Sequence, residues 1–268
     1  MSNKDSKPET ALKETPNKEL TTLFTGRHCI VLDEVDSTNS FLSGYINGKL
    51  LPEGSVVRTI HQTDGRGQKG AGWYSEAGKN LIQSFVFYPS FLYAKDVFQL
   101  NKAFALGVYD FVSNFLGDGV KIKWPNDIYY DTLKIGGLLI ENAVYGSMLT
   151  SCILGIGINV NQTVFPKELQ NAGSFSLIKR KTFDLEMLFA ALCSFLEKRY
   201  LSLKSGDVKI IEEDYLSVLY GFGKVKKFQS GGEVFNGVIK GVDENGKLLV
   251  QKEDGREGNY GIKEIAFL

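Results

Sequence analysis

Residues 65–70 read Gly65-Arg66-Gly67-Gln68-Lys69-Gly70, and the interpretation of this stretch decides the fold class. The GxGxxG spacing matches a dinucleotide-binding loop, which needs a preceding strand, a helix that opens at the last glycine, and an acid about 20 residues further on. Residues 54–60 can form the strand, but residues 71–78 are too rich in glycine to begin a stable helix, and residues 79–92 contain no acid. The loop is therefore interpreted as a flexible cationic segment, closed by Trp73, that suits wrapping an anion.

Composition excludes several classes of function. The 268 residues contain 31 Lys+Arg and 31 Asp+Glu, and the formal net charge of 0 gives no global field that would attract nucleic acid or a membrane. Three cysteines without CxxC spacing and two histidines supply neither a disulfide framework nor a zinc site. No apolar run approaches the ~18 residues that span a bilayer, and the N-terminus lacks the apolar segment of a signal peptide. We therefore expect a cytoplasmic protein with no membrane partner.

The chain divides into three segments. Residues 1–25 are polar and are expected to form a disordered tail, because they cannot bury enough apolar surface to offset chain entropy. Residues 26–220 alternate strand and helix patterns and are expected to form the main domain. Residues 221–268 contain short strands separated by glycine-rich turns, which is typical of a small antiparallel barrel.

Within the main domain, hydrophobic periodicity predicts long helices at about 96–116, 185–203 and 208–219. Strands are predicted at 120–124, 138–144 and 148–160, the last two joined by a tight hairpin.

Polar clusters interrupt the apolar strands in a pattern that fits the joining of a carboxylate to a nucleotide. Bringing a carboxylate to an α-phosphorus forces anions together at ~3 to 4 Å, which costs several kcal/mol unless cations lie between them. Arg66, Lys69 and Lys134 can supply those cations. Asn126 and Asp127 offer hard oxygen ligands that suit Mg²⁺ on a triphosphate.

Five motifs in a fixed order resemble those of the biotin protein ligase family, the biotin–[biotin carboxyl carrier protein] ligases. They are DSTN (36–39), QTDGRGQKGAGW (62–73), KWPND (123–127), KIGGLLIEN (134–142) and GIGINVN (155–161), and the resemblance covers about residues 26–268. It implies an α+β fold in which helices cover one face of a mixed β-sheet, similar to the catalytic domain of class II aminoacyl-tRNA synthetases, with an SH3-like barrel at the C-terminus. The implied reaction forms biotinyl-5′-AMP and pyrophosphate from biotin and ATP, and then transfers biotin to a lysine of a carrier domain.

The resemblance also implies roles for individual residues. The implied catalytic residues are Lys134, Arg66 and Asp127. Biotin contacts would come from Ser37, Thr38, Asn39, Gln62, Gly65, Arg66, Gly67, Lys134, Gly136, Gly137 and Gly155. Nucleotide contacts would come from Arg66, Lys69, Trp73, Lys123, Asn126, Lys134, Gly157 and Asn159, with Asn126 and Asp127 as Mg²⁺ ligands.

The loop departs from the best-known bacterial member at Gln68, Ala71 and Gly72, which replace three cations, so weaker retention of the adenylate is a hypothesis.

No winged helix-turn-helix precedes the main domain, so DNA binding is not expected, and the charge fits either a monomer or a homodimer. The nearest alternative is a lipoate or octanoate ligase or transferase of the same fold. A second alternative is a noncatalytic module whose barrel recruits a peptide or RNA.

Overall fold

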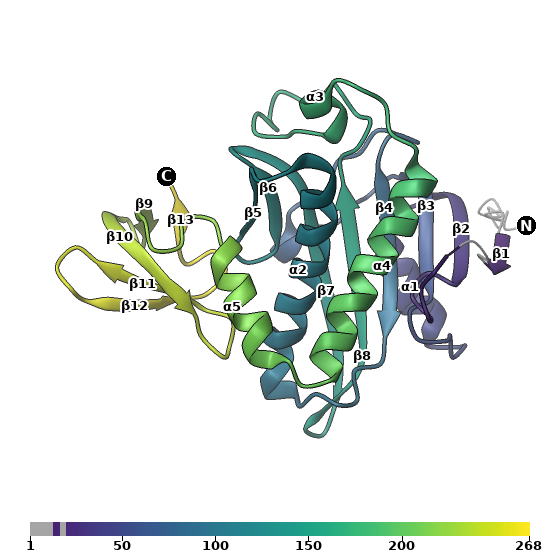
Figure 1. Ribbon diagram of the computed structural model, residues 1–268, viewed down its shortest axis with the longest axis horizontal. Helices are drawn as coiled ribbons and strands as arrows, with labels where there is room; N and C mark the ends of the chain where they lie inside the picture. Colours follow the sequence, from purple (N-terminus) through teal and green to yellow (C-terminus); the bar gives the residue numbers. More distant parts are fainter. Residues whose placement is uncertain (1–12, 17–19) are drawn as a thin grey trace, which may run out of the picture.

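The structure is a computed structural model that describes residues 13–16 and 20–268. Its main sheet contains β1 (Lys13–Pro16), β2 (His28–Val35), β3 (Val56–Gln62), β4 (Leu81–Phe87), β5 (Val120–Lys123), β6 (Asp127–Tyr130), β7 (Leu133–Tyr145) and β8 (Met148–Ile158). The strand order is β1-β2-β3-β4-β8-β7-β6-β5, and only β2 and β3 run parallel within it. The sheet is therefore mixed, as predicted (Figure 1).

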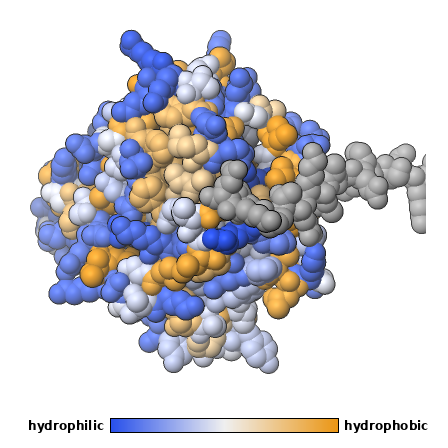
Figure 2. Space-filling model, turned by 45° about the vertical axis from the view of Figure 1, so that its right-hand side comes forward, coloured by the Kyte–Doolittle hydropathy of each residue, from blue (hydrophilic) through white to orange (hydrophobic). Residues whose placement is uncertain are grey.

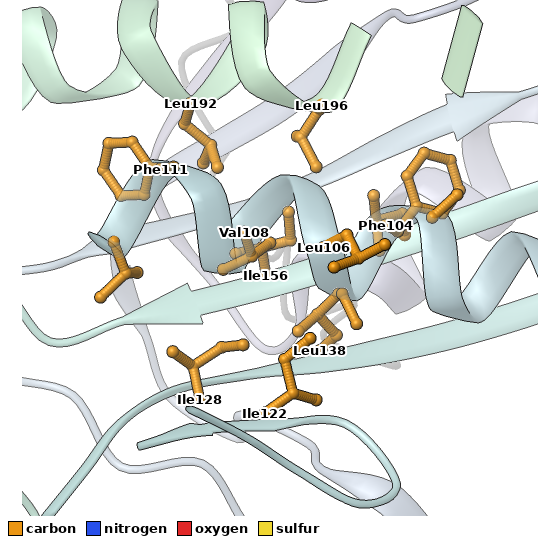
Figure 3. Packing of buried hydrophobic residues seen from close by; sticks show 14 of the residues in the cluster. Phe104, Leu106, Val108, Phe111, Ile122, Ile128, Leu138, Ile156, Leu192 and Leu196 are labelled. Atoms are coloured by element: carbon orange, nitrogen blue, oxygen red, sulfur yellow. The ribbon is translucent and has the colours of Figure 1, made fainter. Parts of the chain in front are cut away.

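The long helices cover one face of this sheet. The helices are α1 (Thr38–Ile46), α2 (Val97–Leu116), α3 (Phe175–Lys179), α4 (Leu185–Lys204) and α5 (Val208–Val218), with short 3₁₀ turns η1 (Gln68–Gly70) and η2 (Ala94–Asp96). Figure 3 shows side chains of α2 between those of α4 and those of the strands. The helices approach closely at Gly107, where a Cβ would lie 3.1 Å from the Cα of Leu196.

One helix lies on the opposite face. Leu42 of α1 packs in a separate apolar cluster with Val86 of β4 and Ile153 of β8. Because neighbouring residues of a strand point to opposite faces, Val86 is directed away from the α2 side, where Phe85 and Phe87 lie. The predicted arrangement thus holds for the long helices, and α1 is the exception. Its position matters because the helix begins at the DSTN motif.

Three local features differ from the expectations. Residues 127–130 form the strand β6, which was not predicted, and β7 begins at Leu133 instead of at 138, so it includes Lys134. The described part of the expected disordered tail is ordered: β1 pairs antiparallel with β2. Residues 20–25 also pack against the domain, and the Glu197 carboxylate accepts hydrogen bonds from the backbone N–H groups of residues 23–25. The remainder of that tail, residues 1–12 and 17–19, lies outside the described residues.

A second, antiparallel sheet follows α5 and lies beside it in Figure 1. It comprises β9 (Val225–Ser230), β10 (Glu233–Val242), β11 (Leu248–Lys252), β12 (Glu257–Tyr260) and β13 (Ala266–Phe267), in the order β12-β11-β10-β9-β13. Trp124 joins it to the main domain, because its indole Nε1 donates a hydrogen bond of 2.9 Å to the carbonyl of Gly246.

Most of the large apolar side chains are buried in the core. On the face shown in Figure 2, hydrophobic residues gather in patches that hydrophilic residues separate. Within the described ranges, no helix is both long enough and apolar enough to cross a membrane.

Candidate active site

A cavity of about 210 Å³ lies between the glycine loop, the start of α1, and strands β4, β7 and β8. Most of the residues that the motifs singled out line it. They are Ser37, Thr38, Asn39, Gln62, Arg66, Gly67, Trp73, Asn126, Asp127, Lys134, Gly137, Gly155 and Gly157. The sequence therefore identified segments that are far apart in the chain and adjacent in space.

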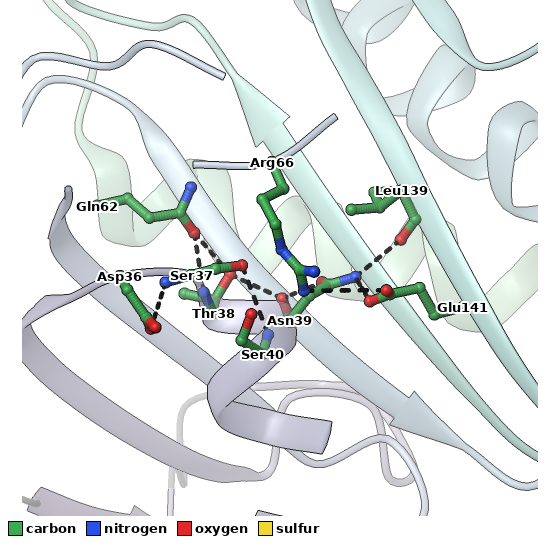
Figure 4. A network of polar contacts seen from close by, with 10 residues as sticks. Asp36, Ser37, Thr38, Asn39, Ser40, Gln62, Arg66, Leu139 and Glu141 are labelled. Carbon is green, nitrogen blue, oxygen red and sulfur yellow. Dashed lines mark hydrogen bonds and ion pairs between the residues drawn. The ribbon is translucent and has the colours of Figure 1, made fainter. Parts of the chain in front are cut away.

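Hydroxyl and amide groups form one end of the cavity, at the start of α1 (Figure 4). Ser37 caps the helix, which places the Thr38 backbone N–H and hydroxyl toward Gln62. Both groups donate to Gln62 Oε1, at 2.9 Å and 3.2 Å. The hydroxyl of Ser84, on β4, lies 2.7 Å from the Thr38 hydroxyl and 2.6 Å from Asn39 Oδ1. This end offers closely spaced donors and acceptors to a small polar ring.

Asn39 is held in one orientation by two neighbouring strands. Its Nδ2 donates to Glu141 Oε2 at 2.7 Å and to the carbonyl of Leu139 at 3.3 Å. A Cβ on Gly155 would lie only 2.2 Å from Asn39 Oδ1. The glycine inside β8 is thus explained by the close approach of this amide.

The other end of the cavity is charged. Lys134 Nζ lies 2.8 Å from Asp127 Oδ1, and the Lys134 ammonium lies 5.8 Å from the centre of the Trp73 ring. A Cβ on Gly137 would lie 3.1 Å from Asp127 Oδ1 and 3.7 Å from Lys134 Cε. Asn126 Nδ2 donates to the carbonyl of Leu138, which fixes the residue next to Asp127. Because Lys134 projects from a strand, its backbone is held in place by the sheet, and its ammonium is confined more than that of a lysine in a loop.

Trp73 forms a wall of the cavity. Its indole lies against Gly157, where a Cβ would approach Trp73 Cε2 to 2.4 Å. Its backbone N–H donates to the carbonyl of Gly65 at 2.7 Å, and a Cβ on Gly65 would lie 2.4 Å from the Trp73 carbonyl oxygen. The position of Trp73 therefore requires glycine at both 65 and 157.

A second cavity, of about 370 Å³, lies on the other side of Trp73. Trp73, Gly72 and Lys134 line both cavities, and Asn159, Phe165 and residues 168–172 line the second. The backbone of this segment is tied to β7, because the N–H of Lys134 donates to the carbonyl of Asn171 at 2.6 Å. The sequence analysis did not single out Phe165 or residues 168–172, since this stretch contains no glycine and none of the quoted motifs.

Some candidate residues lie elsewhere. Lys123 lines neither cavity, and its ammonium lies among the rings of Tyr129, Tyr220 and Phe267, at 4.9, 5.8 and 5.1 Å from their centres. Burial there lowers the pKa of Lys123. Gly65 and Gly136 are buried behind the lining residues. The side chain of Lys69 lies outside what the structure describes.

Arg66 and Lys134 line the same cavity and point to different partners. The guanidinium of Arg66 lies 3.9 Å from Glu141 Oε1, at the amide end. The sequence analysis assigned no role to Gln83, which lines the cavity, or to Glu141 and Ser84, which bond to residues that line it. Among the described residues, no group of three or more His, Cys, Asp or Glu side chains could hold a metal ion.

Comparison with known proteins gives a consistent result. Residues 31–159 match the Biotin/lipoate A/B protein ligase family, and residues 226–262 match the Biotin protein ligase C terminal domain. The bifunctional ligase/repressor BirA of Bacillus subtilis is 32% identical over 249 residues, which are 92% of this chain and 74% of that protein. The biotin–[acetyl-CoA-carboxylase] ligase of Mycobacterium tuberculosis is 26% identical, over 84% of this chain and 83% of that protein.

The fold comparison agrees. The biotin protein ligase of Aquifex aeolicus, solved in complex with biotin and ATP, has a TM-score of 0.74 and 26% sequence identity, covering 90% of this chain and 98% of its own. The first four motifs and the residues that line the first cavity lie within residues 31–159, and most of the C-terminal sheet lies within residues 226–262. The chain therefore belongs to the biotin protein ligase family.

Proposed function

We propose that the protein is an ATP-dependent biotin protein ligase that forms biotinyl-5′-AMP and transfers biotin to a lysine of a carrier domain. One observation carries the proposal: a cavity with an amide and hydroxyl end runs to the Lys134–Asp127 pair, and Lys134 and Trp73 also line a second cavity. This arrangement allows a small carboxylic acid and a nucleotide to meet at one lysine. The family membership and the biotin and ATP bound to the Aquifex aeolicus relative support it.

In the first step, the ureido ring of biotin is held by Ser37, Thr38 and Gln62, with Ser84 and Asn39 behind them. The valeryl chain runs along Gly155 and Gly137 toward Lys134. A biotin carboxylate oxygen attacks the α-phosphorus of ATP, a new O–P bond forms, and pyrophosphate leaves with the electron pair of the broken bond. The Lys134 ammonium lowers the barrier because it faces the charge that accumulates between the two anions.

In the second step, the carrier lysine attacks the acyl carbon of the adenylate. An amide bond forms, the C–O bond to the phosphate breaks, and AMP leaves as the anion. The attacking amine must lose a proton, and Asp127 is the carboxylate closest to the reacting centre in the described cavity. Asp127 is therefore assigned as the group that accepts this proton.

The nucleotide is assigned to the second cavity. Trp73 and Asn159 would flank its base, and Gly157 would allow close approach of the backbone. Mg²⁺ would arrive with the triphosphate, and Asn126 and Asp127 fit it as a pair of oxygen ligands that leaves most of the coordination to phosphate and water. Lys123 is assigned no contact with the nucleotide, because it lies among rings next to the C-terminal sheet.

The partner is proposed to be the biotin carboxyl carrier domain of a biotin-dependent carboxylase. The cytoplasmic location, the monomeric or homodimeric state and the lack of DNA binding stay predictions from the sequence. Lipoate or octanoate as the acid is the less favoured alternative, since the relatives compared are named as biotin ligases.

A direct assay tests the function. Purified protein is incubated with ATP, Mg²⁺ and either biotin or lipoate, pyrophosphate release is measured, and transfer is followed by the mass increase of an added carrier domain. We expect pyrophosphate release and transfer with biotin only. Release that depends on lipoate, or no release with either acid, would overturn the proposal.

A further inference from the structure

Arg66 is paired with Glu141 at the amide end of the cavity, although the family resemblance implies a catalytic role for it beside the reacting anions. Its guanidinium lies 3.9 Å from Glu141, whereas Lys134 extends toward Gly137. Gly137 and Glu141 are four positions apart on β7, which corresponds to roughly 13 Å along an extended strand. The two cations of the cavity therefore have partners at opposite ends of it.

We infer that Glu141 is a positioning residue that holds Arg66 at the amide end of the cavity before substrate binds. This inference rests on the proposed function. The biotin carboxylate and the α-phosphate must attract Arg66 away from Glu141, so the ion pair competes with the anionic part of the ligand. Glu141 thus sets how tightly the enzyme binds a charged ligand without touching it.

The two oxygens of Glu141 have separate partners, which makes the inference testable. Oε2 accepts from Asn39 Nδ2 at 2.7 Å, and Oε1 faces Arg66 (Figure 4). In the Glu141→Gln variant, the amide oxygen can still accept from Asn39, while the charge that holds Arg66 is removed. The side chains of Arg66 and Glu141 are 44% and 43% exposed, so solvent screens their attraction and the competition is modest. We expect the variant to bind biotin about 2- to 5-fold more tightly.

The experiment measures dissociation constants by calorimetry for biotin and for its alcohol analogue, in which CH₂OH replaces the carboxylate. Glu141→Gln should tighten biotin alone, because the alcohol offers Arg66 no anion. The matched control is Glu186→Gln, which breaks an Arg–Glu pair with Arg58 remote from the cavity and should change neither constant. In an Arg66→Ala background, Glu141→Gln should no longer tighten biotin.

Each other outcome contradicts the inference. Equal changes for biotin and the alcohol would indicate a structural role through Asn39. No change, weaker biotin binding, or tightening that persists without Arg66 would show that Glu141 does not act by holding this arginine. Failure of the unmodified protein to bind biotin would instead overturn the proposed function, so the two failures are distinguishable.

Discussion

Gly155→Ala tests the packing that defines the amide end of the cavity. The added Cβ would lie 2.2 Å from Asn39 Oδ1, whereas ordinary van der Waals contact begins near 3.4 Å. Asn39 must therefore retreat by about 1 Å. That movement stretches its contacts to Ser84, Leu139 and Glu141, which now measure 2.6, 3.3 and 2.7 Å.

The cost follows from those contacts. Two neutral hydrogen bonds contribute about 0.5–1.5 kcal/mol each, and one to a carboxylate contributes about 1.5–3 kcal/mol. Partial relaxation recovers some of this sum, so we expect a loss of about 2–4 kcal/mol in the free energy of unfolding. For a domain of about 200 residues this lowers the melting temperature by at least about 4 °C. Biotin binding should weaken as well, because Asn39 lines the cavity.

A double-mutant cycle with Asn39→Ala isolates the cause. Once the amide is gone, the new methyl group has no oxygen to meet, so Gly155→Ala should cost less than about 1 kcal/mol in that background. The four proteins are compared by calorimetric melting under one set of conditions. If the two substitutions prove additive within about 0.5 kcal/mol, the clash with Asn39 is refuted as the reason for this glycine.

Three further outcomes are expected. Lys134→Ala should lower the rate of biotin-dependent pyrophosphate release by about 10²–10³-fold, because the cation beside the reacting anions is lost. It should lower the free energy of unfolding by only about 1 kcal/mol or less, because the Lys134–Asp127 pair is partly exposed. Lys121→Ala is the control, and near-normal release from Lys134→Ala would contradict the assignment. Gly157→Ala should displace the indole of Trp73 toward solvent and shift its fluorescence emission maximum to the red. The measurement uses a Trp124→Phe background, in which Trp73 is the one tryptophan left. An unchanged emission maximum would argue against the packing of Trp73 on Gly157. Burial raises the pKa of Tyr129 from 10.0 to about 12, so the folded protein keeps a proton that the unfolded chain loses, and stability falls as pH rises through this window. Tyr129→Phe should lessen that loss in urea unfolding at about pH 9 and about pH 11, and an identical alkaline decline in both proteins would contradict it.

The sequence predicted the residues of the site better than their partners. Ser37 and Thr38 are recognisable because a cap cluster precedes an apolar helix, which is a local signal. Ser84 and Glu141 have no such signal, since each lies in a strand interior next to one other polar residue, Gln83 or Asn142, and no cap or turn marks the position. They reach Asn39 only because β4, β8 and β7 are neighbours in the sheet, and that register cannot be read from a single chain.

Local patterns also misled in one place. The KWPND motif contains turn-forming residues, so the strand that begins at its last residue was missed. The role of Lys123 at the nucleotide was implied by the family resemblance and stays untested. Its ammonium lies among the rings of Tyr129, Tyr220 and Phe267, and the last two are about a hundred residues or more away in the chain, so their proximity cannot be read from the sequence.

The position of β4 affects the order in which the protein loses its functions on heating. All seven residues of this strand are buried, and it lies between β3 and β8 near the middle of the sheet. It carries Ile82 and Gln83, which line the cavity, whereas the loop that carries Arg66 is largely exposed. Local unfolding begins where burial is least, so warming should release the loop well before β4 opens. A heat-stressed molecule would then still bind biotin, but water would hydrolyse the acyl–phosphate anhydride of the adenylate to biotin and AMP, so ATP is consumed without labelling the carrier domain.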